Sequence, residues 1–316
     1  MTTSDGNSTP DNSPPDNIAP DNIADIDIAQ SVAVVTGGAG GIGKGIVGAL
    51  LRRGAAVVIA DIEQAAIDAA VQQLAELGSV TGIRTDVSDE ASVRALADYV
   101  FDAHGKCNLL YNNAGVTSGG GGKPWQQEPN DWRWCFGVNV FGVAICVSEF
   151  VPRMLESGEP GQVINTSSGD GGFAPVPTAS VYASSKAAVS CFTEALHHNL
   201  VSEDTQLRAS VFYPSGGLLR TGLFTASRNR PEHLARVGVA TGRKSMTFEE
   251  KKGMLAAAGR DVTEADLDAL GDFVVVETAA RRYIITMDLR DTVDLLHRRA
   301  NAIGDLNVPP HHGMPV

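Results

Sequence analysis

A run of glycines between two apolar segments restricts the fold of this chain more than any other feature. Residues 32–35 (VAVV) are short, apolar and mostly β-branched, which predicts a strand buried on both faces of a parallel sheet. The glycine-rich residues 36–43 (TGGAGGIG) follow directly, and residues 44–51 have the apolar spacing of a helix that packs on a sheet. This order is typical of a dinucleotide-binding turn, because glycines let the backbone approach a pyrophosphate and the helix N-terminus supplies amide donors. We therefore expect dinucleotide contacts from Gly37, Gly41, Ile42 and Gly43.

The next predicted strand, residues 56–60, ends at an acidic residue about twenty residues past the glycines. The Asp61 carboxylate can accept hydrogen bonds from both ribose hydroxyls of the adenosine and repels a 2′-phosphate, which favours NAD over NADP. The turn before Gly41 contains no arginine or lysine, which points the same way, although Arg52 and Arg53 follow closely. The alternative is that Asp61 merely caps the next helix.

Predicted helices and strands alternate along the rest of the chain. Helices are expected near residues 64–77, 90–104, 130–152 and 182–202, and strands near residues 80–85, 109–111, 162–165, 208–213 and 283–286. This order predicts an α/β protein with a Rossmann-like, doubly wound parallel sheet in a single domain. Ligands of such sheets bind at the carboxyl ends of the strands. Five residues at predicted strand ends are therefore further cofactor candidates: Asp86, Val87, Asn113, Ala114 and Gly115.

The segment YASSK places a tyrosine and a lysine four residues apart, at Tyr182 and Lys186. On a helix these side chains share a face. An ammonium beside a phenol favours the phenolate and lowers the pKa of the phenol toward the range of a general acid or base. The pair can then move a proton on and off an alcohol. Taken alone the spacing is weak evidence, because it also occurs on ordinary solvated helix faces.

Together these motifs resemble the short-chain dehydrogenase/reductase superfamily, in its non-extended branch with TGxxxGxG and YxxxK motifs. The resemblance covers about residues 28–287. It is carried, in chain order, by TGGAGGIG at 36–43, Asp61, Asp86, NNAG at 112–115, Asn139 within FGVNVFG, Ser168 after a strand, and YASSK at 182–186.

The resemblance implies a role for each catalytic candidate. Tyr182 donates or removes the alcohol proton, and Ser168 hydrogen-bonds the substrate oxygen. Lys186 lowers the pKa of Tyr182 and binds the nicotinamide ribose, while Asn139 supports a water that links Lys186 to solvent. Ser167 stays as an alternative to Ser168, because the separation from Ser168 to Tyr182 is about one residue longer than the commonest family spacing.

The chain departs from the family pattern after the catalytic helix. The family usually has a Pro-Gly pair there, whereas this chain reads Pro214-Ser215-Gly216-Gly217, with Thr221 a few residues on. Pro214 and Thr221 are still expected to meet the nicotinamide. Residues 215–280 resemble a helical substrate lid that is longer than the family minimum, which implies a bulky secondary alcohol or ketone.

Composition restricts the partners. The net charge of −12 argues against nucleic acid and an anionic membrane, so a small molecule is the expected partner. The four cysteines form no CxxC pair, which predicts reduced thiols in a cytoplasmic protein and no metal site. No apolar run approaches the ~20 residues that span a bilayer, and no signal peptide is expected. Residues 1–28 predict a disordered acidic tail, residues 29–300 the single domain, and residues 301–316 a C-terminal tail.

The sequence therefore predicts an NAD-dependent oxidoreductase that interconverts a secondary alcohol and a ketone, as a homodimer or homotetramer. A second hypothesis is a non-catalytic protein that binds NAD(H) on the same sheet and reports its redox state. A third is an epimerase or dehydratase of the extended branch, which the glycine spacing disfavours.

Overall fold

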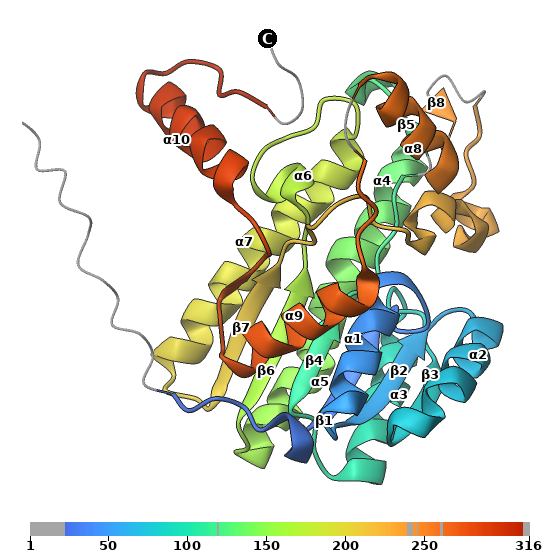
Figure 1. The fold of residues 1–316 in the computed structure, drawn as a ribbon, viewed down its shortest axis with the longest axis vertical. Helices are drawn as coiled ribbons and strands as arrows, with labels where there is room; N and C mark the ends of the chain where they lie inside the picture. The colour runs from blue at the N-terminus through green and yellow to red at the C-terminus, as the bar shows by residue number, and fades with distance from the viewer. Residues whose placement is uncertain (1–22, 119, 239–242, 245, 260–261, 312–316) are drawn as a thin grey trace, which may run out of the picture.

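A seven-stranded, fully parallel sheet forms the centre of the molecule (Figure 1). The structure is a computed structural model that describes residues 23–311 except 119, 239–242, 245 and 260–261. The strand order is β3-β2-β1-β4-β6-β7-β9. The strands are β1 (Val32–Thr36), β2 (Ala56–Asp61), β3 (Val80–Arg84), β4 (Leu109–Asn112), β6 (Gly161–Thr166), β7 (Leu207–Phe212) and β9 (Ile284–Ile285). The predicted doubly wound sheet is confirmed.

Helices cover both faces of the sheet and divide the core into two layers. The helices whose buried residues join the first layer are α1 (Gly41–Arg52), α2 (Gln64–Leu74) and α9 (Leu267–Ala279). Those of the second layer are α3 (Glu90–His104), α5 (Gly142–Ser157) and α7 (Ser180–Ser202). The others are α4 (Pro129–Phe136), α6 (Gly169–Gly172), α8 (Phe248–Ala257) and α10 (Arg290–Gly304), and β5 (Gly120–Gly121) pairs with β8 (Arg243–Lys244) in a small second sheet.

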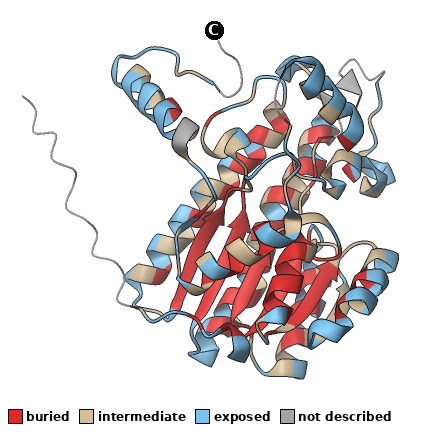
Figure 2. Cartoon of the chain, in the orientation of Figure 1, coloured by how far each residue is buried: buried red, intermediate tan, exposed pale blue. Residues whose placement is uncertain are grey.

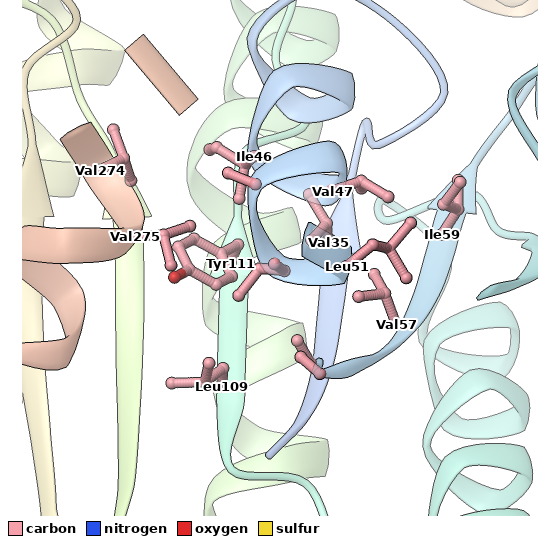
Figure 3. Packing of buried hydrophobic residues seen from close by; sticks show 14 of the residues in the cluster. Val35, Ile46, Val47, Leu51, Val57, Ile59, Leu109, Tyr111, Val274 and Val275 are labelled. Carbon is pink, nitrogen blue, oxygen red and sulfur yellow. The ribbon is translucent and has the colours of Figure 1, made fainter. Parts of the chain in front are cut away.

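The central strands are buried along their whole length (Figure 2). Because both faces are covered by helices, burial is continuous along these strands rather than alternating, although β6 and β7 also carry buried polar side chains. In the first layer Ile46 and Leu51 of α1 pack over Val35 of β1 and Val57 of β2 (Figure 3). The short apolar runs in the sequence thus become the middle of the core.

Helix α9 crosses α1 at a pair of glycines. A Cβ built on Gly271 would lie 2.3 Å from the carbonyl carbon of Gly45, and one built on Gly45 would lie 2.2 Å from the Leu267 oxygen. Val274 and Val275 of α9 are fully buried beside α1 (Figure 3). Residues 215–280 were expected to form the lid, but the structure places α9 in the core, so the segment outside the core ends before Leu267.

The N-terminal boundary also differs from the prediction. Ile26 and Ile28 are buried, and the Ile26 N–H donates a hydrogen bond to the Ala279 oxygen at 2.9 Å. The packed chain therefore begins earlier than residue 29, and most of the predicted acidic tail, residues 1–22, lies outside the described residues. At the other end α10 continues to Gly304, four residues beyond the predicted domain end at 300, and residues 312–316 of the predicted tail are not described.

One helical segment of the described chain, Pro129–Ser157, is long and apolar enough by length and composition to cross a membrane. Sequence analysis did not predict this segment, because polar residues interrupt its apolar runs. Half of its most apolar window is buried inside the molecule, and α5 packs against β4, β6 and α3. Core helices of this kind pass the same test without a membrane.

Replacing Gly271 by alanine is expected to lower the free energy of unfolding by ~1–3 kcal/mol, because the added methyl group overlaps the α1 backbone. Gly253→Ala is the matched control, since no atom lies within 4 Å of a Cβ built on this helical glycine. The control is expected to gain up to ~1 kcal/mol from helix propensity. Urea unfolding of both variants measures the difference, and equal stability of the two would contradict the close α1–α9 crossing.

Candidate active site

A cavity of about 1260 Å³ opens along the carboxyl ends of the central strands. Its wall includes all the predicted cofactor and catalytic residues except Gly43 and Asn139, which are buried behind it. Residues far apart in the sequence meet here because parallel strands end at one edge of the sheet. The remaining wall comes from the segments that follow β4, β6 and β7.

The glycine turn after β1 presents backbone to this cavity. Gly37 and Gly41 have positive φ angles of 63° and 54°, which glycine adopts without strain. A Cβ on Gly37 would lie 2.9 Å from the Ala114 Cα, and one on Gly43 would lie 2.2 Å from the Gly37 oxygen. Helix α1 begins at Gly41, and its N-cap residue, Gly40, makes no side-chain cap bond. The turn therefore fits a pyrophosphate, with amide donors that no side chain occupies.

The end of β4 is tied to the same turn. The Thr36 hydroxyl oxygen accepts hydrogen bonds from the N–H groups of Asn113 and Ala114, each at 3.0 Å. The Asn113 side-chain amide donates to the Thr36 oxygen at 3.1 Å and to the Gly37 oxygen at 3.3 Å. Gly115 follows in the cavity wall. The NNAG segment thus fixes the glycine turn from the neighbouring strand.

Asp61 lies at the end of β2, in the cavity wall. Its carboxylate accepts hydrogen bonds from the N–H groups of Ala39 and Glu63, each at 3.2 Å. Burial raises the pKa of Asp61, and these backbone bonds oppose the rise. The N-cap of α2 is Glu63 rather than Asp61, so Asp61 does not cap that helix through its side chain.

The end of β3 contributes the next cofactor candidates. The Asp86 carboxylate accepts from the Ser88 N–H at 2.9 Å and from the Ser88 hydroxyl at 2.7 Å. Val87 is buried and forms part of the cavity wall. The loop after β3 is therefore held in a fixed shape beside the cavity.

Tyr182 and Lys186 lie one turn apart on α7 and both face the cavity. The Lys186 ammonium donates to the Thr166 oxygen at 2.8 Å and lies 5.8 Å from the centre of the Tyr182 ring. Burial lowers the pKa of Lys186 to about 8. Burial raises the pKa of Tyr182, and a hydrogen bond with Ser168 opposes that rise. The expected lowering of the Tyr182 pKa by Lys186 is not found, because desolvation outweighs the other effects on the phenol.

The two serines after β6 have different surroundings. The Ser167 hydroxyl is buried, donates to the Lys186 carbonyl oxygen at 2.8 Å and lies 2.8 Å from the Ser190 hydroxyl. Ser168 is partly exposed, accepts from the Asp170 N–H at 3.2 Å and lies close enough to the Tyr182 phenol to oppose the rise in its pKa. Both serines border the cavity, but the Ser167 hydroxyl joins β6 to α7, whereas Ser168 is the more exposed of the two.

Asn139 lies in a π-helical turn, η4 (Gly137–Phe141), between α4 and α5. Its side chain accepts from the Val116 N–H at 2.8 Å and donates to the Val116 oxygen at 2.9 Å and to the Ser185 hydroxyl at 2.9 Å. A Cβ built on Gly115 would lie 3.4 Å from the Asn139 oxygen and 3.5 Å from the Lys186 nitrogen. The amide thus holds the loop after β4 behind Lys186 and does not face the cavity.

The loop after β7 carries the last two predicted residues. Pro214 lies in the cavity wall, and Gly216 and Gly217 follow with positive φ angles of 98° and 127°. Thr221 is the N-cap of η5 (Gly222–Asn229) and accepts from the Leu223 N–H at 3.4 Å. The Thr221 Cβ would lie 3.2 Å from a Cβ built on Gly41. The loop therefore reaches the glycine turn from the opposite side of the cavity.

Two clusters of charged side chains hold the segment between β7 and α9, which borders the cavity, and sequence reasoning missed both. Buried Asp131 on α4 accepts hydrogen bonds from Arg230 and Arg236, each at 2.8 Å. Burial raises the pKa of Asp131, but the two guanidinium groups outweigh it and hold the pKa below its ordinary value. Glu63, next to Asp61, bonds to Arg228 and Asn229 of η5. The position of Asp131 on the inward side of a helix could have indicated a buried carboxylate from the sequence. Its arginine partners could not be predicted, because they lie about a hundred residues away in the chain.

Comparison with known proteins agrees with this geometry. A family model described as short chain dehydrogenase matches residues 31–231. A C alpha-dehydrogenase of Sphingobium sp. is 34% identical over 70% of this chain and 70% of its own length. A 3beta-hydroxysteroid dehydrogenase 2 of Eggerthella lenta is 31% identical over 74% of this chain and 89% of its own.

A solved short chain dehydrogenase/reductase from Burkholderia phymatum, in complex with NAD, superposes with a TM-score of 0.81 at 33% identity. It covers 92% of this chain and all of that one. The matched model spans the glycine turn, Asp61, Ser168, Tyr182 and Lys186. The chain belongs to the short-chain dehydrogenase family.

Proposed function

We propose that this short-chain dehydrogenase uses NAD to interconvert a bulky secondary alcohol and its ketone, with Tyr182 as general acid and base. The observation that carries the proposal is that Ser168, Tyr182 and Lys186 line the same cavity wall that the glycine turn also borders. One site thus combines a place for a dinucleotide with a proton donor.

The proton chemistry follows from the surroundings of Tyr182. A bound nicotinamide supplies or accepts the hydride. In ketone reduction the Ser168 hydroxyl hydrogen-bonds the substrate oxygen while Tyr182 gives it a proton, and in alcohol oxidation the tyrosine takes that proton back. The raised pKa of Tyr182 keeps the phenol protonated, which is the form that ketone reduction needs, but it also makes the proton harder to release. Turnover therefore requires stabilisation of the phenolate in the loaded site, and we assign this role to the Lys186 ammonium, 5.8 Å from the centre of the ring.

Positioning falls to residues behind this pair. Asn139 fixes the loop that packs against Lys186, and the Thr166 oxygen orients the ammonium. Preorganised groups of this kind lower the barrier because they do not have to reorganise during proton transfer. In this proposal Ser168 and Tyr182 contact the substrate oxygen, while Lys186 and Asn139 support them from behind.

The choice of NAD rests on Asp61. Its carboxylate stands at the end of β2 in the cavity wall, where an adenosine ribose binds in this fold, and a 2′-phosphate there would meet a negative charge. The glycine turn, Asp86, Val87 and the NNAG segment complete the proposed cofactor site. The similar Burkholderia protein was solved with NAD, which supports the same choice.

The size and lining of the cavity support a bulky substrate. Beyond the cofactor candidates, its wall carries large apolar side chains from the segments after β6 and β7, among them Phe173, Leu218, Phe224 and Met254. Apolar walls of this extent bind large apolar ligands by burying their surface. One relative is named for a hydroxysteroid, which fits a large substrate.

We further propose a cytoplasmic homodimer or homotetramer. The four cysteines are free thiols, as a reducing compartment requires. The helices that carry Asn139 and Tyr182 are the proposed subunit contact, and Phe141, on the first of these segments, is 60% exposed. Sedimentation velocity at micromolar concentration is expected to show a dimer or tetramer, and a single species of monomer mass would contradict this assembly.

Replacing Tyr182 by phenylalanine is expected to lower turnover ~10²–10⁴-fold, because the proton donor is lost. The dissociation constant for NADH, measured by fluorescence titration, is expected to stay within about twofold. Tyr213→Phe is the matched control, since Tyr213 lines the same cavity but bonds to Ser190 at 3.1 Å. Unchanged turnover in the Tyr182 variant would reject the acid–base role, and NADH binding without turnover of any alcohol by the unaltered protein would favour a sensor of NAD state.

Replacing Asp61 by asparagine is expected to reduce the preference for NADH over NADPH about tenfold, because the amide removes the charge that repels a 2′-phosphate. Asparagine keeps an acceptor oxygen for the Ala39 N–H, so the glycine turn is retained. Parallel fluorescence titrations with the two reduced cofactors measure the effect. Tighter binding of NADPH by the unaltered protein would show that Asp61 is misassigned.

A further inference from the structure

A lysine interrupts the inward face of helix α8, which lies in the segment over the cavity. Phe248 is buried and packs edge-on against Phe224, with ring centres 5.7 Å apart. Lys251 follows three residues later on the same face, and both Lys251 and Met254 line the cavity. Lys251 is partly buried, whereas charged groups on helices usually lie on the solvent face.

The Lys251 ammonium has no partner within the part of the chain that the structure describes. No hydrogen bond or ion pair to it is formed there, although Lys252, the next residue, reaches Glu264 at 3.4 Å. An ammonium in a cavity wall that no protein carboxylate neutralises is available to an anion bound in the cavity. We therefore expect the negative charge that pairs with Lys251 to belong to a ligand bound in the cavity.

Other charged groups of the cavity wall are already engaged. Glu63 pairs with Arg228, the Lys186 ammonium donates to the Thr166 oxygen, and the Asp61 carboxylate accepts backbone amides. Lys123 is exposed and lies over the Trp125 ring, 5.3 Å from its centre.

Three further carboxylates line the wall: Asp86, which accepts hydrogen bonds from Ser88, and the exposed Asp170 and Asp288. None of them forms an ion pair with Lys251 among the described residues. Lys251 is thus a cation that faces the cavity from the α8 side with its charge uncompensated.

We propose that Lys251 binds a carboxylate of the substrate. The inference rests on the proposed function and narrows its substrate to secondary alcohols or ketones that carry a carboxylate away from the carbinol. The carbinol has to lie at Tyr182 on α7 and the anion at Lys251 on α8, in a cavity whose wall also carries the apolar side chains of Phe224, Met246 and Met254. An ammonium–carboxylate contact in a largely apolar wall selects strongly, because the charge-assisted bond is weakly screened.

The test uses the full-length protein with NAD and a panel of aryl and alkyl secondary alcohols, each as the carboxylate and as its methyl ester; 4-(1-hydroxyethyl)benzoate and its ester form one pair. The unaltered enzyme is expected to prefer the acid at least about tenfold in kcat/KM. Lys251→Met is expected to raise KM for the acid about tenfold while kcat and the ester kinetics stay within about twofold. Lys252→Met, which removes the neighbouring lysine paired with Glu264, is expected to keep the preference for the acid.

NADH affinity of the Lys251 variant, measured by fluorescence titration, separates two sources of the anion. Unchanged affinity together with loss of the acid preference supports a substrate carboxylate. Weakened NADH binding with equal losses for acid and ester would assign the ammonium to the cofactor pyrophosphate and overturn the inference. Turnover of the esters with no preference for the acids would also overturn it while leaving the proposed function intact; failure of every pair would overturn both.

Discussion

Direct contact of backbone with backbone at the carboxyl ends of β1 and β4 is the constraint on which the rest of the site depends. At Gly37 and Gly43 even a methyl group would overlap the main chain, at 2.9 Å and 2.2 Å. The Thr36 hydroxyl adds the two hydrogen bonds that join β1 to the NNAG segment. Because α1 starts from this turn, its direction over the sheet is set here. The second close glycine contact, between Gly45 of α1 and Gly271 of α9, fixes the position of α9, the helix that follows the segment bordering the cavity.

The segment between β7 and α9, which borders the cavity, is held in place by ion pairs to α4 and to the end of β2 rather than by hydrogen bonds of the central sheet. Asp131 anchors it to α4 through two arginines, and Glu63 joins η5 to the end of β2. Asp131 is fully buried, so its carboxylate depends on these guanidinium groups, and losing both would leave an uncompensated buried charge. The Glu63 contact is partly exposed and correspondingly weaker. The segment is thus fixed firmly at α4 and more loosely at η5, beside the end of β2.

The sequence predicts the elements that depend on local pattern and fails where distant partners decide. The helix expected over residues 90–104 is α3, and the strand expected near residues 162–165 is β6, because their apolar periodicity is set by the sheet alone. Helix α9 was expected in the lid, since nothing local shows that Gly271 meets Gly45. Ile26 and Ile28 alternate with acidic residues in a polar tail, so their burial depends on a contact with Ala279 that the sequence does not display.

The register of strand β6 in the sheet, which the motifs do not specify, brings the predicted site residues together. Three consecutive residues at the end of β6 carry three tasks: the Thr166 oxygen holds the Lys186 ammonium, Ser167 bonds the α7 backbone, and Ser168 meets Tyr182. Successive side chains of a strand point to opposite faces, so a shift of one residue would exchange the two serines. The register of β6 between β4 and β7, from Asn112↔Asn165 to Thr166↔Phe212, therefore decides which hydroxyl reaches the tyrosine. Spacing from Tyr182 could not decide it, because the intervening loop and α6 absorb the extra residue.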